Sequence, residues 1–564
     1  MVFNMKEIYL DIMEKALSAY TDERIRDYID EVKRDGLTEH GFARLGSDMG
    51  ILIAHGRRKG LLPVFIEIMD ICCEQMPKVK AANDFTIREV CFCLMLLEEK
   101  KTVDSALLCK WKKQIASFDP WKYYNAVVPS PDVPFGNWAL FAAVSEYVRN
   151  IYCGIDTSDF IERQLSTQIP CFDSNGMYRD EYPHNPEADH LTNPFVYDMV
   201  SRFLISILLR CGYKGKYTDK LIEFLDKSSD ITLKMLSVTG EIPFGGRSNQ
   251  FLNNEPLYAS YFELEAVRFA QMRDMQKAVE LKASAHLAAE STLKYLNLNP
   301  ISHIKNRYDV STKIGCEGYG YFNKYMITVA SNIYSAYLFA DDSIKPCKPI
   351  SQKGAYVVST SKDFNKTFLN AGDYFLELDT EADFHYDANG IGRIHKKDCP
   401  AMLCLSMPFA KTPNYNLESS NETNMSLCCY CEKGGKMLLG AEDYAEYTLL
   451  NSESAENRAF AEFRIKLSEN ITINQKITLS EKGVDIALCG EEDIGMMIPV
   501  FDFDGANNTN INFFENSVSI EYNGAVCVYS FDGKLSKDFK YYYNRNGRYK
   551  VFKMVGKHLV IKIN

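Results

Sequence analysis

The sequence predicts a chain of mixed α and β structure, with a closed helical toroid in its N-terminal part and an antiparallel β-sandwich in its C-terminal part. From the start to about residue 297, apolar residues recur at helical spacing and strand-like alternation is nearly absent. Beyond about residue 305 the apolar residues alternate with polar ones. A chain of 564 residues is also too long for one hydrophobic core. We therefore expect two domains, a helical one over 1–340 and a β domain over 341–564.

About a dozen helices are expected, and several are joined by short polar connections that suit antiparallel pairs. The best-defined helical segments are 7–20, 61–76, 85–99, 138–152, 194–211, 220–236 and 275–296. The clearest alternating segments are 462–467, 471–479, 518–522 and 558–563, and Asn-Gly and Asp-Gly pairs mark turns between strands. Paired helices without a solenoid repeat, followed by a sandwich, favour a closed toroid. The segment 301–342 is expected to bridge the two parts.

The composition argues against several classes of function. A formal net charge of −11 disfavours nucleic acid as a partner, because a phosphate backbone requires a basic surface. We find neither a signal-peptide pattern nor a run of 18 uncharged apolar residues, so we expect a cytoplasmic protein without a membrane partner. The 17 cysteines lie mostly in apolar segments, as reduced cysteines do, and no second ligand pair completes the CxxC spacing at 428–431. We expect no metal and no other cofactor, and the chain is compatible with a homo-oligomer.

The longest connection without helical spacing, residues 168–193, concentrates side chains that can carry chemistry. Its segment MYRDEYPHNPEADH, at 177–190, holds four carboxylates, two histidines and two tyrosines, and an Asn193-Pro capping pattern follows it. A solvated polar loop would explain the charges but does not require the aromatic residues. From this segment and the next helix we select candidate acids or bases, which are Asp180, Asp189, His190 and Asp198. The candidate substrate-binding residues here are Tyr178, His184 and Asn193.

Two shorter motifs add candidates. GNW, at 136–138, places Asn137 and Trp138 at the start of an apolar helix, where they either cap the helix and fill the core or line a sugar subsite. Glu317 is flanked by glycines in the run CEGYGY, so the backbone can bring its carboxylate close to a ligand, and Tyr319 follows in the same run. A plain β-turn near the domain junction would have the same composition.

The segment PFGGRSNQF, at 243–251, places an arginine on a glycine hinge between two helices. An arginine on a loop is often solvated, but its guanidinium also pairs with carboxylates in a two-pronged geometry that lysine does not offer. We therefore expect Arg247 to bind an anion, with Ser248 beside it. Tyr258, in the helix that follows, is a further candidate.

The order of these motifs resembles a bacterial family long described as a domain of unknown function, which includes exo-acting β-glucuronidases of glycoside hydrolase family 154. The matching segments are GNW at 136–138, NGMYRD at 175–180, NP at 193–194, IPFGGRS at 242–248 and GYG at 318–320. The sequence departs from the family at Gly136, Arg179 and Phe195, has an extra glycine before Arg247, and lacks the Thr-Tyr-Arg that follows Ser248 in typical members. The resemblance implies an (α/α)6 toroid and an antiparallel β-domain, an architecture that heparinase-type and alginate-type lyases share.

The motifs and the resemblance together favour a carbohydrate-active enzyme for short uronate-containing oligosaccharides. In the leading hypothesis it hydrolyses a terminal glucuronate, with Asp180 and Glu317 as the carboxyl pair, Asp189 or Asp198 as substitutes, and Arg247 on the substrate carboxylate. Toroid hydrolases commonly invert, which requires carboxyl groups about 6.5–9.5 Å apart.

Two alternatives remain. A lyase would cleave the uronate by β-elimination, with a histidine and a tyrosine moving protons and Asn137, Asn193 or Arg247 neutralising the carboxylate. A carbohydrate-binding or scaffolding protein would need none of the titratable groups for its function.

Overall fold

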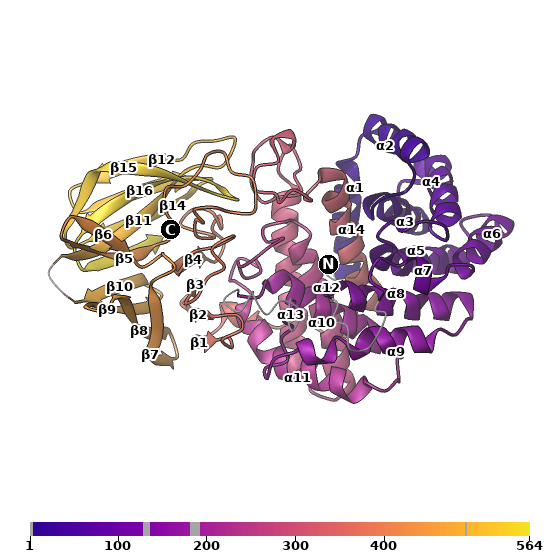
Figure 1. Cartoon of the computed structure of the whole chain (residues 1–564), viewed down its shortest axis with the longest axis horizontal. Helices are drawn as coiled ribbons and strands as arrows, with labels where there is room; N and C mark the ends of the chain where they lie inside the picture. Colours follow the sequence, from indigo (N-terminus) through magenta and orange to yellow (C-terminus); the bar gives the residue numbers. More distant parts are fainter. Residues whose placement is uncertain (1–3, 128–135, 181–191, 491–492) are drawn as a thin grey trace.

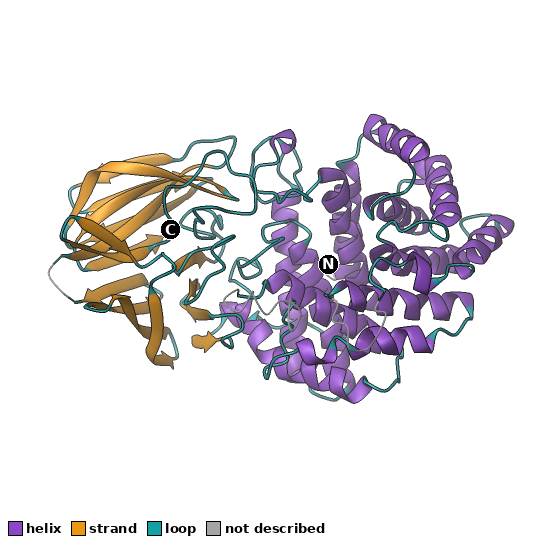
Figure 2. Ribbon diagram, in the orientation of Figure 1, coloured by secondary structure: helices purple, strands orange, loops and turns teal. Residues whose placement is uncertain are grey.

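The computed structural model describes residues 4–127, 136–180, 192–490 and 493–564. These residues form a helical part and a β part that lie side by side along the long axis of the molecule (Figures 1 and 2). The predicted succession of helices and then antiparallel sheets is confirmed. No helix within the described ranges is both long and apolar enough to cross a membrane.

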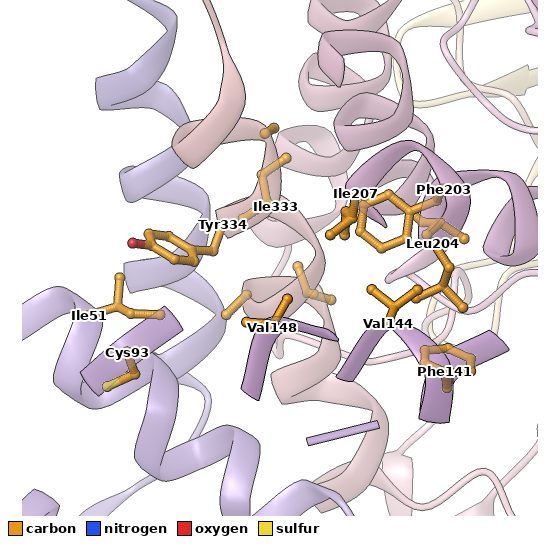
Figure 3. Packing of buried hydrophobic residues seen from close by; sticks show 14 of the residues in the cluster. Ile51, Cys93, Phe141, Val144, Val148, Phe203, Leu204, Ile207, Ile333 and Tyr334 are labelled. Atoms are coloured by element: carbon orange, nitrogen blue, oxygen red, sulfur yellow. The ribbon is translucent and has the colours of Figure 1, made fainter. Parts of the chain in front are cut away.

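Six helices form a closed ring at the centre of the helical part. In the order in which each packs on the next, with the last returning to the first, they are α3 (Gly41–Ala54), α5 (Asn83–Lys100), α8 (Trp138–Cys153), α10 (Phe195–Arg210), α12 (Asn254–Gln271) and α14 (Phe322–Phe339). Their facing side chains share one hydrophobic core, in which Figure 3 shows Ile51 of α3, Phe141 of α8, Phe203 of α10 and Ile333 of α14. Burial of this core holds the ring together.

A second layer of helices surrounds this ring. Its members are α1 (Met5–Ser18), α2 (Asp22–Asp35), α4 (Leu62–Gln75), α6 (Ser105–Ala116), α9 (Ser158–Ser166), α11 (Thr218–Met235) and α13 (Met275–Leu296), with a single turn α7 (Pro120–Tyr123). Outer helices pack on inner ones, for example α13 on α12, α1 on α14, α9 on α8 and α4 on α3. This alternation of inner and outer helices is the expected toroid.

Two local features differ in detail from the expectation. The segment 301–342 does not serve as a bridge alone, because it contains α14, the sixth inner helix, inside the range 1–340 expected for the helical domain. The residues from Met326 to Ala336 are buried on every side, so the helix has no solvated face and no amphipathic period in its sequence. Asn193 does not cap α10 either, because the helix begins at Phe195 and the Asn193 amide donates to the Asp363 carbonyl at 3.0 Å.

The β part contains three antiparallel sheets. The four-stranded sheet, in spatial order, consists of β1 (Tyr356–Ser359), β2 (Lys366–Ala371), β3 (Tyr374–Asp379) and β4 (Gly390–Lys396). The eight-stranded sheet consists, in spatial order, of β12 (Asn510–Phe514), β13 (Ser517–Tyr522), β14 (Ala525–Phe531), β17 (His558–Ile563), β10 (Gly483–Cys489), β9 (Ile471–Ser480), β8 (Arg458–Ser468) and β7 (Glu446–Ala455). The five-stranded sheet consists of β15 (Lys534–Asn544), β16 (Gly547–Val555), β11 (Ile494–Phe503), β5 (Cys428–Lys433) and β6 (Lys436–Leu439).

The two larger sheets pack face to face as a sandwich. Ile473 and Ile477 of β9 lie in the same buried cluster as Ile498 and Val500 of β11. The alternation seen in the sequence therefore reports which side chains face this shared core. The cysteines of the CxxC segment lie in β5, buried as thiols, so the prediction of a strand there is confirmed.

The four-stranded sheet joins the sandwich to the toroid. Phe368 of β2 and Phe375 of β3 share a buried cluster with Phe195 of α10 and Met235 of α11. All residues of β2 and β3 are buried, which requires cover on both faces of the sheet. The loop between α11 and α12, which carries PFGGRSNQF, hydrogen-bonds to this sheet and is enclosed between the two parts.

Candidate active site

A cavity of about 580 Å³ lies at the end of the toroid where the six inner helices begin. Every inner helix contributes to its wall from the residue before the helix or from its first turns. These contributions include His40 before α3, Ala82 before α5, Trp138 of α8, Tyr197 of α10, Asn254 of α12 and Tyr325 of α14. Because each helix N-terminus is equivalent to about half a positive charge, the arrangement suits an anionic ligand.

Two amide oxygens on the cavity wall have no hydrogen-bond partner among the described residues. They are Oδ1 of Asn137 and Oδ1 of Asn253, and both side chains are buried. Asn137 occupies the cap position of α8 without capping it, and its Nδ2 donates instead to Oδ1 of Asp180 at 2.5 Å. A buried acceptor without a donor is costly, so these oxygens are suited to the hydroxyl groups of a ligand.

Asp180 and Arg247, which the sequence proposed as catalytic and anion-binding residues, meet on this wall. Arg247 pairs through Nη2 with Oδ2 of Asp180, and its guanidinium lies 4.6 Å from the ring centre of Tyr197. Asp180 is buried and is the only carboxylate that lines the cavity within the described part of the chain. Both of its oxygens therefore already accept hydrogen bonds, one from Asn137 and one from Arg247.

The loop that carries Arg247 is anchored by buried carboxylates at alternate backbone N–H groups. The three donor and acceptor pairs are Phe244 with Oε2 of Glu377 at 3.3 Å, Gly246 with Oδ2 of Asp387 at 2.8 Å, and Ser248 with Oε1 of Glu317 at 2.5 Å. Gly246 has a φ of 75°, and a Cβ there would lie 2.5 Å from the Cβ of Pro194. The glycine hinge thus permits a close approach to the start of α10.

Glu317 lies behind this wall and does not line the cavity. Both of its oxygens accept hydrogen bonds from Arg545, at 2.9 and 2.7 Å, and Arg545 also donates to the carbonyl of Gly315. Glu317 and Arg545 are both buried. Glu317, which the sequence suggested as half of a catalytic carboxyl pair, thus contacts the Ser248 backbone and Arg545 in this structure. Glycines on both sides indicated a close approach, but they could not show that the partner was another protein segment.

A chain of three hydroxyl groups lies beside Arg247. Oγ of Ser248 is 3.0 Å from the hydroxyl of Tyr197 and 2.8 Å from the hydroxyl of Tyr319, and all three residues line the cavity. Burial raises the pKa of both phenols, and the Arg247 guanidinium opposes this effect at Tyr197. Both tyrosines are therefore protonated at neutral pH and can pass a proton through Ser248.

The sequence reasoning missed a basic group on the cavity wall, at the start of α3. Nη1 of Arg44 donates to Nδ1 of His40 at 3.0 Å, while Glu89 binds the same guanidinium at 2.9 and 3.1 Å. Burial, together with the charges of Arg44 and Lys324, holds the pKa of His40 well below its usual range. Since arginine only donates, the neutral imidazole carries its hydrogen on Nε2 and is a donor there. Lys324 also lines the cavity.

The remaining predicted residues divide into three groups. Trp138 lines the cavity, and its ring packs edge-on against Phe85 with centroids 4.7 Å apart. Asp198, Tyr178, Asn193 and Tyr258 do not line it: Asp198 pairs with Arg202 inside the toroid, the Tyr178 hydroxyl donates to Gln168, and Tyr258 is fully buried. His184, Asp189 and His190 lie outside the described residues.

The residues that were missed come from helix starts that carry no motif. His40, Arg44, Asn253, Asn332 and Lys324 are spread over three inner helices, and no short spacing links them. The signal that would have found them is the toroid itself, because it brings the N-termini of its inner helices to one end. Within the described ranges, no group of three or more histidine, cysteine or acidic side chains is placed to hold a metal ion.

We compared the chain with known proteins, and the matches found are to the overall arrangement of solved structures. No protein-family model and no curated protein matches the chain. Among solved structures, heparinase III is 11% identical over 92% of this chain and 76% of its own, with a TM-score of 0.45. A mutant of heparan sulfate lyase HepC from Pedobacter heparinus is 11% identical over 93% of this chain and 75% of its own, with a TM-score of 0.46. A GH127 β-L-arabinofuranosidase from Geobacillus stearothermophilus T6 is 8% identical over 99% of this chain and 98% of its own, with a TM-score of 0.37. Sequence identities and TM-scores this low carry no argument about the function of this chain.

Proposed function

We propose that the protein is an enzyme that cleaves a uronate-containing oligosaccharide bound in the toroid cavity. One observation carries the proposal: six helix N-termini converge on a cavity whose wall also holds Arg247, Arg44 and Lys324, with Asp180 as the one described carboxylate. A carboxylate group of the ligand is favoured there by the helix dipoles and by the charged donors. The unpartnered amide oxygens of Asn137 and Asn253 suit the hydroxyl groups of a sugar.

Elimination is the chemistry that the described wall residues support best. In β-elimination a base removes the proton at C5 of the uronate, the bond from C4 to the bridging oxygen breaks, and that oxygen takes up a proton. We assign proton removal to the phenolate form of Tyr197 and protonation of the leaving oxygen to Tyr319, which remains a phenol. Burial raises the pKa of Tyr197 and the Arg247 guanidinium beside its ring opposes this effect, so the active form is the fraction that has released the Tyr197 proton to solvent. Ser248 connects the two hydroxyls and can return the proton between turnovers. Arg247 and the Nε2–H of His40 stabilise the negative charge that develops on the carboxylate.

Hydrolysis of a terminal glucuronate is the second candidate. Asp180 favours it, because this carboxylate lies on the cavity wall between Asn137 and Arg247, where it can act on water or on the anomeric carbon. A second carboxyl group is then required. Glu317 does not supply it from its position behind Ser248, so in this mechanism the partner comes from Glu181, Glu187 or Asp189, which follow Asp180 in the sequence.

Incubation with an oligosaccharide that contains internal glucuronates carrying a sugar on O4, and that also ends in a non-reducing glucuronate, separates the two chemistries. Elimination yields an unsaturated uronate that absorbs in the near ultraviolet, while hydrolysis yields saturated glucuronate. We expect the absorbing product, and we expect Tyr319→Phe to lower kcat by about a hundredfold or more. Tyr258→Phe is the control, since it also removes a single tyrosine hydroxyl, but from a fully buried residue that lies off the cavity wall. Release of saturated glucuronate, with Tyr319→Phe as active as the wild type and Asp180→Asn inactive, would establish hydrolysis instead.

A further inference from the structure

A second cavity, of about 940 Å³, lies beside the first. Its wall is formed by α2, by the connection from α2 to α3, and by the segment that leads into α14. Lys324 lines both cavities, so the two adjoin at this residue. We take this shared residue as the point at which a long saccharide would pass from the first cavity to the second.

The second cavity has an aromatic surface of the kind that binds sugar rings. Tyr321 is 52% exposed, and Phe322 follows it on the same wall. The Lys313 amino group lies 4.8 Å from the ring centre of Tyr321, and the Arg24 guanidinium lies 4.2 Å from the ring centre of Phe322. Both cations are therefore held against rings at the edge of this surface. An exposed tyrosine combines an apolar ring face with a hydroxyl group that can form hydrogen bonds.

The charge of the second cavity is opposite to that of the first. Glu23, Asp27 and Glu31 follow one another at intervals of four residues, so they lie on one face of α2, and all three line the cavity and are exposed. None of them forms a hydrogen bond or an ion pair with another residue in the described ranges. Two further carboxylates are already engaged: Asp35 pairs with Arg34 at 2.8 Å, and Glu39 accepts the N–H of Gly41 at 2.6 Å.

We propose that the second cavity binds the part of the saccharide beyond the uronate, and that it prefers a sugar with a positively charged amino group. This inference rests on the proposed function, since it takes the first cavity as the site of the uronate. A sugar that enters past Lys324 can lie on the face of Tyr321, with its ammonium group directed to Asp27 and Glu31. A second uronate or a sulfated sugar would meet three carboxylates and would be repelled.

The first experiment measures binding without catalysis. Calorimetric titration with a trimer of glucosamine, at a pH where its amines are protonated, is compared with the trimer of N-acetylglucosamine. We expect the glucosamine trimer to bind more tightly. The double variant Asp27→Asn/Glu31→Gln should bind this trimer about tenfold more weakly, because each exposed charge pair contributes up to about a fivefold change in affinity. Asp30→Asn is the matched control, because Asp30 is exposed on the same helix but does not line the cavity. Tyr321→Ala should weaken both trimers by a similar factor.

The outcomes of two assays distinguish this inference from the proposed function. Equal affinity for the two trimers, or an equal effect of Asp30→Asn and of the double variant, would overturn the inference. The second assay compares kcat/KM for oligosaccharides in which the uronate carries glucosamine, or N-acetylglucosamine, at both C1 and O4, and we expect the free amine to be preferred in the wild type and not in the double variant. If the trimer binds as expected while no uronate-linked sugar is cleaved, the proposed function fails. If both uronate-linked sugars are cleaved equally well, the proposed function stands and the amino-sugar preference is refuted.

Discussion

The pair formed by Glu317 and Arg545 allows a test of how the cavity wall is supported. Glu317→Gln keeps the shape of the side chain and an oxygen that can accept the Ser248 N–H, but it removes the charge that balances Arg545. Arg545 is fully buried, and two of its side-chain hydrogen bonds go to this carboxylate and a third goes to the Gly315 carbonyl. Loss of one partner from a buried pair costs about 3–5 kcal/mol, because the remaining charge is left in an apolar environment. We expect the free energy of unfolding to fall by about 3 kcal/mol or more.

A double-mutant cycle isolates this interaction. Replacement of both residues, as Glu317→Leu/Arg545→Met, removes both buried charges, so its cost should lie well below the sum of the costs of Glu317→Leu and Arg545→Met alone. Urea unfolding of the four proteins, with equal slopes required for the comparison, gives the coupling energy. A coupling energy near zero, or single costs below about 1 kcal/mol, would contradict the buried-pair argument, since that range is typical of exposed pairs.

The same variant tests whether Glu317 acts in the reaction itself. If it only positions Ser248, Glu317→Gln lowers kcat/KM but leaves the shape of the pH profile unchanged. If Glu317 is a catalytic acid or base, one limb of the profile disappears together with its carboxyl group. The pH dependence of kcat/KM for the variant and the wild type therefore decides between the two roles.

Three further predictions concern the Arg247 loop. Burial raises the pKa of Glu377 and of Asp387 to about 7, so the native state keeps protons that the unfolded chain releases near pH 4. The free energy of unfolding should thus fall as pH rises from about 4 to about 7, by up to about 1.4 kcal/mol per pH unit for each group, and Asp387→Asn should flatten this slope in urea unfolding. Gly246→Ala should destabilise the protein by about 1–3 kcal/mol, because the new Cβ meets Pro194, and unchanged thermal unfolding would contradict the strain argument. Arg247→Lys should weaken glucuronate binding about tenfold in calorimetry, since lysine cannot form a two-pronged contact, and equal affinity would show that only charge matters.

Regular amphipathic helices were predictable from the sequence, while a helix buried on all sides was not. The segment predicted over 220–236 matches α11, Thr218–Met235, an outer helix with one face in solvent, which gives its apolar residues a clear period. The helix α14 lies between inner and outer helices, so burial selects small, polar and aromatic residues around its whole circumference. A helix of this kind can be recognised in a sequence only when the other inner helices of the toroid have been assigned and one of the six is still missing.

The candidate site was predictable residue by residue but not as an arrangement. Motif composition drew attention to Asn137, Asp180 and Arg247, and the structure brings them together although Arg247 follows Asp180 by 67 residues. The same reasoning could not predict that Glu317 is engaged by Arg545, which lies 228 residues later in the turn between two strands. A sequence motif can predict that the backbone around a residue allows a close contact. It cannot predict which residue makes that contact, because the partner depends on how distant segments of the chain pack.

The β part contributes to the cavity without lining it. Every described residue of the cavity wall precedes α14 or lies within it, whereas Glu377, Asp387 and Arg545 belong to the β part. Two of these side chains hold backbone N–H groups of the loop, and Arg545 holds Glu317, which binds a third. Above pH 7, where Asp387 is ionised, Asp387→Asn should therefore weaken glucuronate binding in the toroid cavity, because an amide accepts the Gly246 N–H more weakly than a carboxylate does. The exposed Asp373, in the turn between β2 and β3, provides the control. If Asp387→Asn and Asp373→Asn bind glucuronate equally well, the loop holds Arg247 in place without the β part.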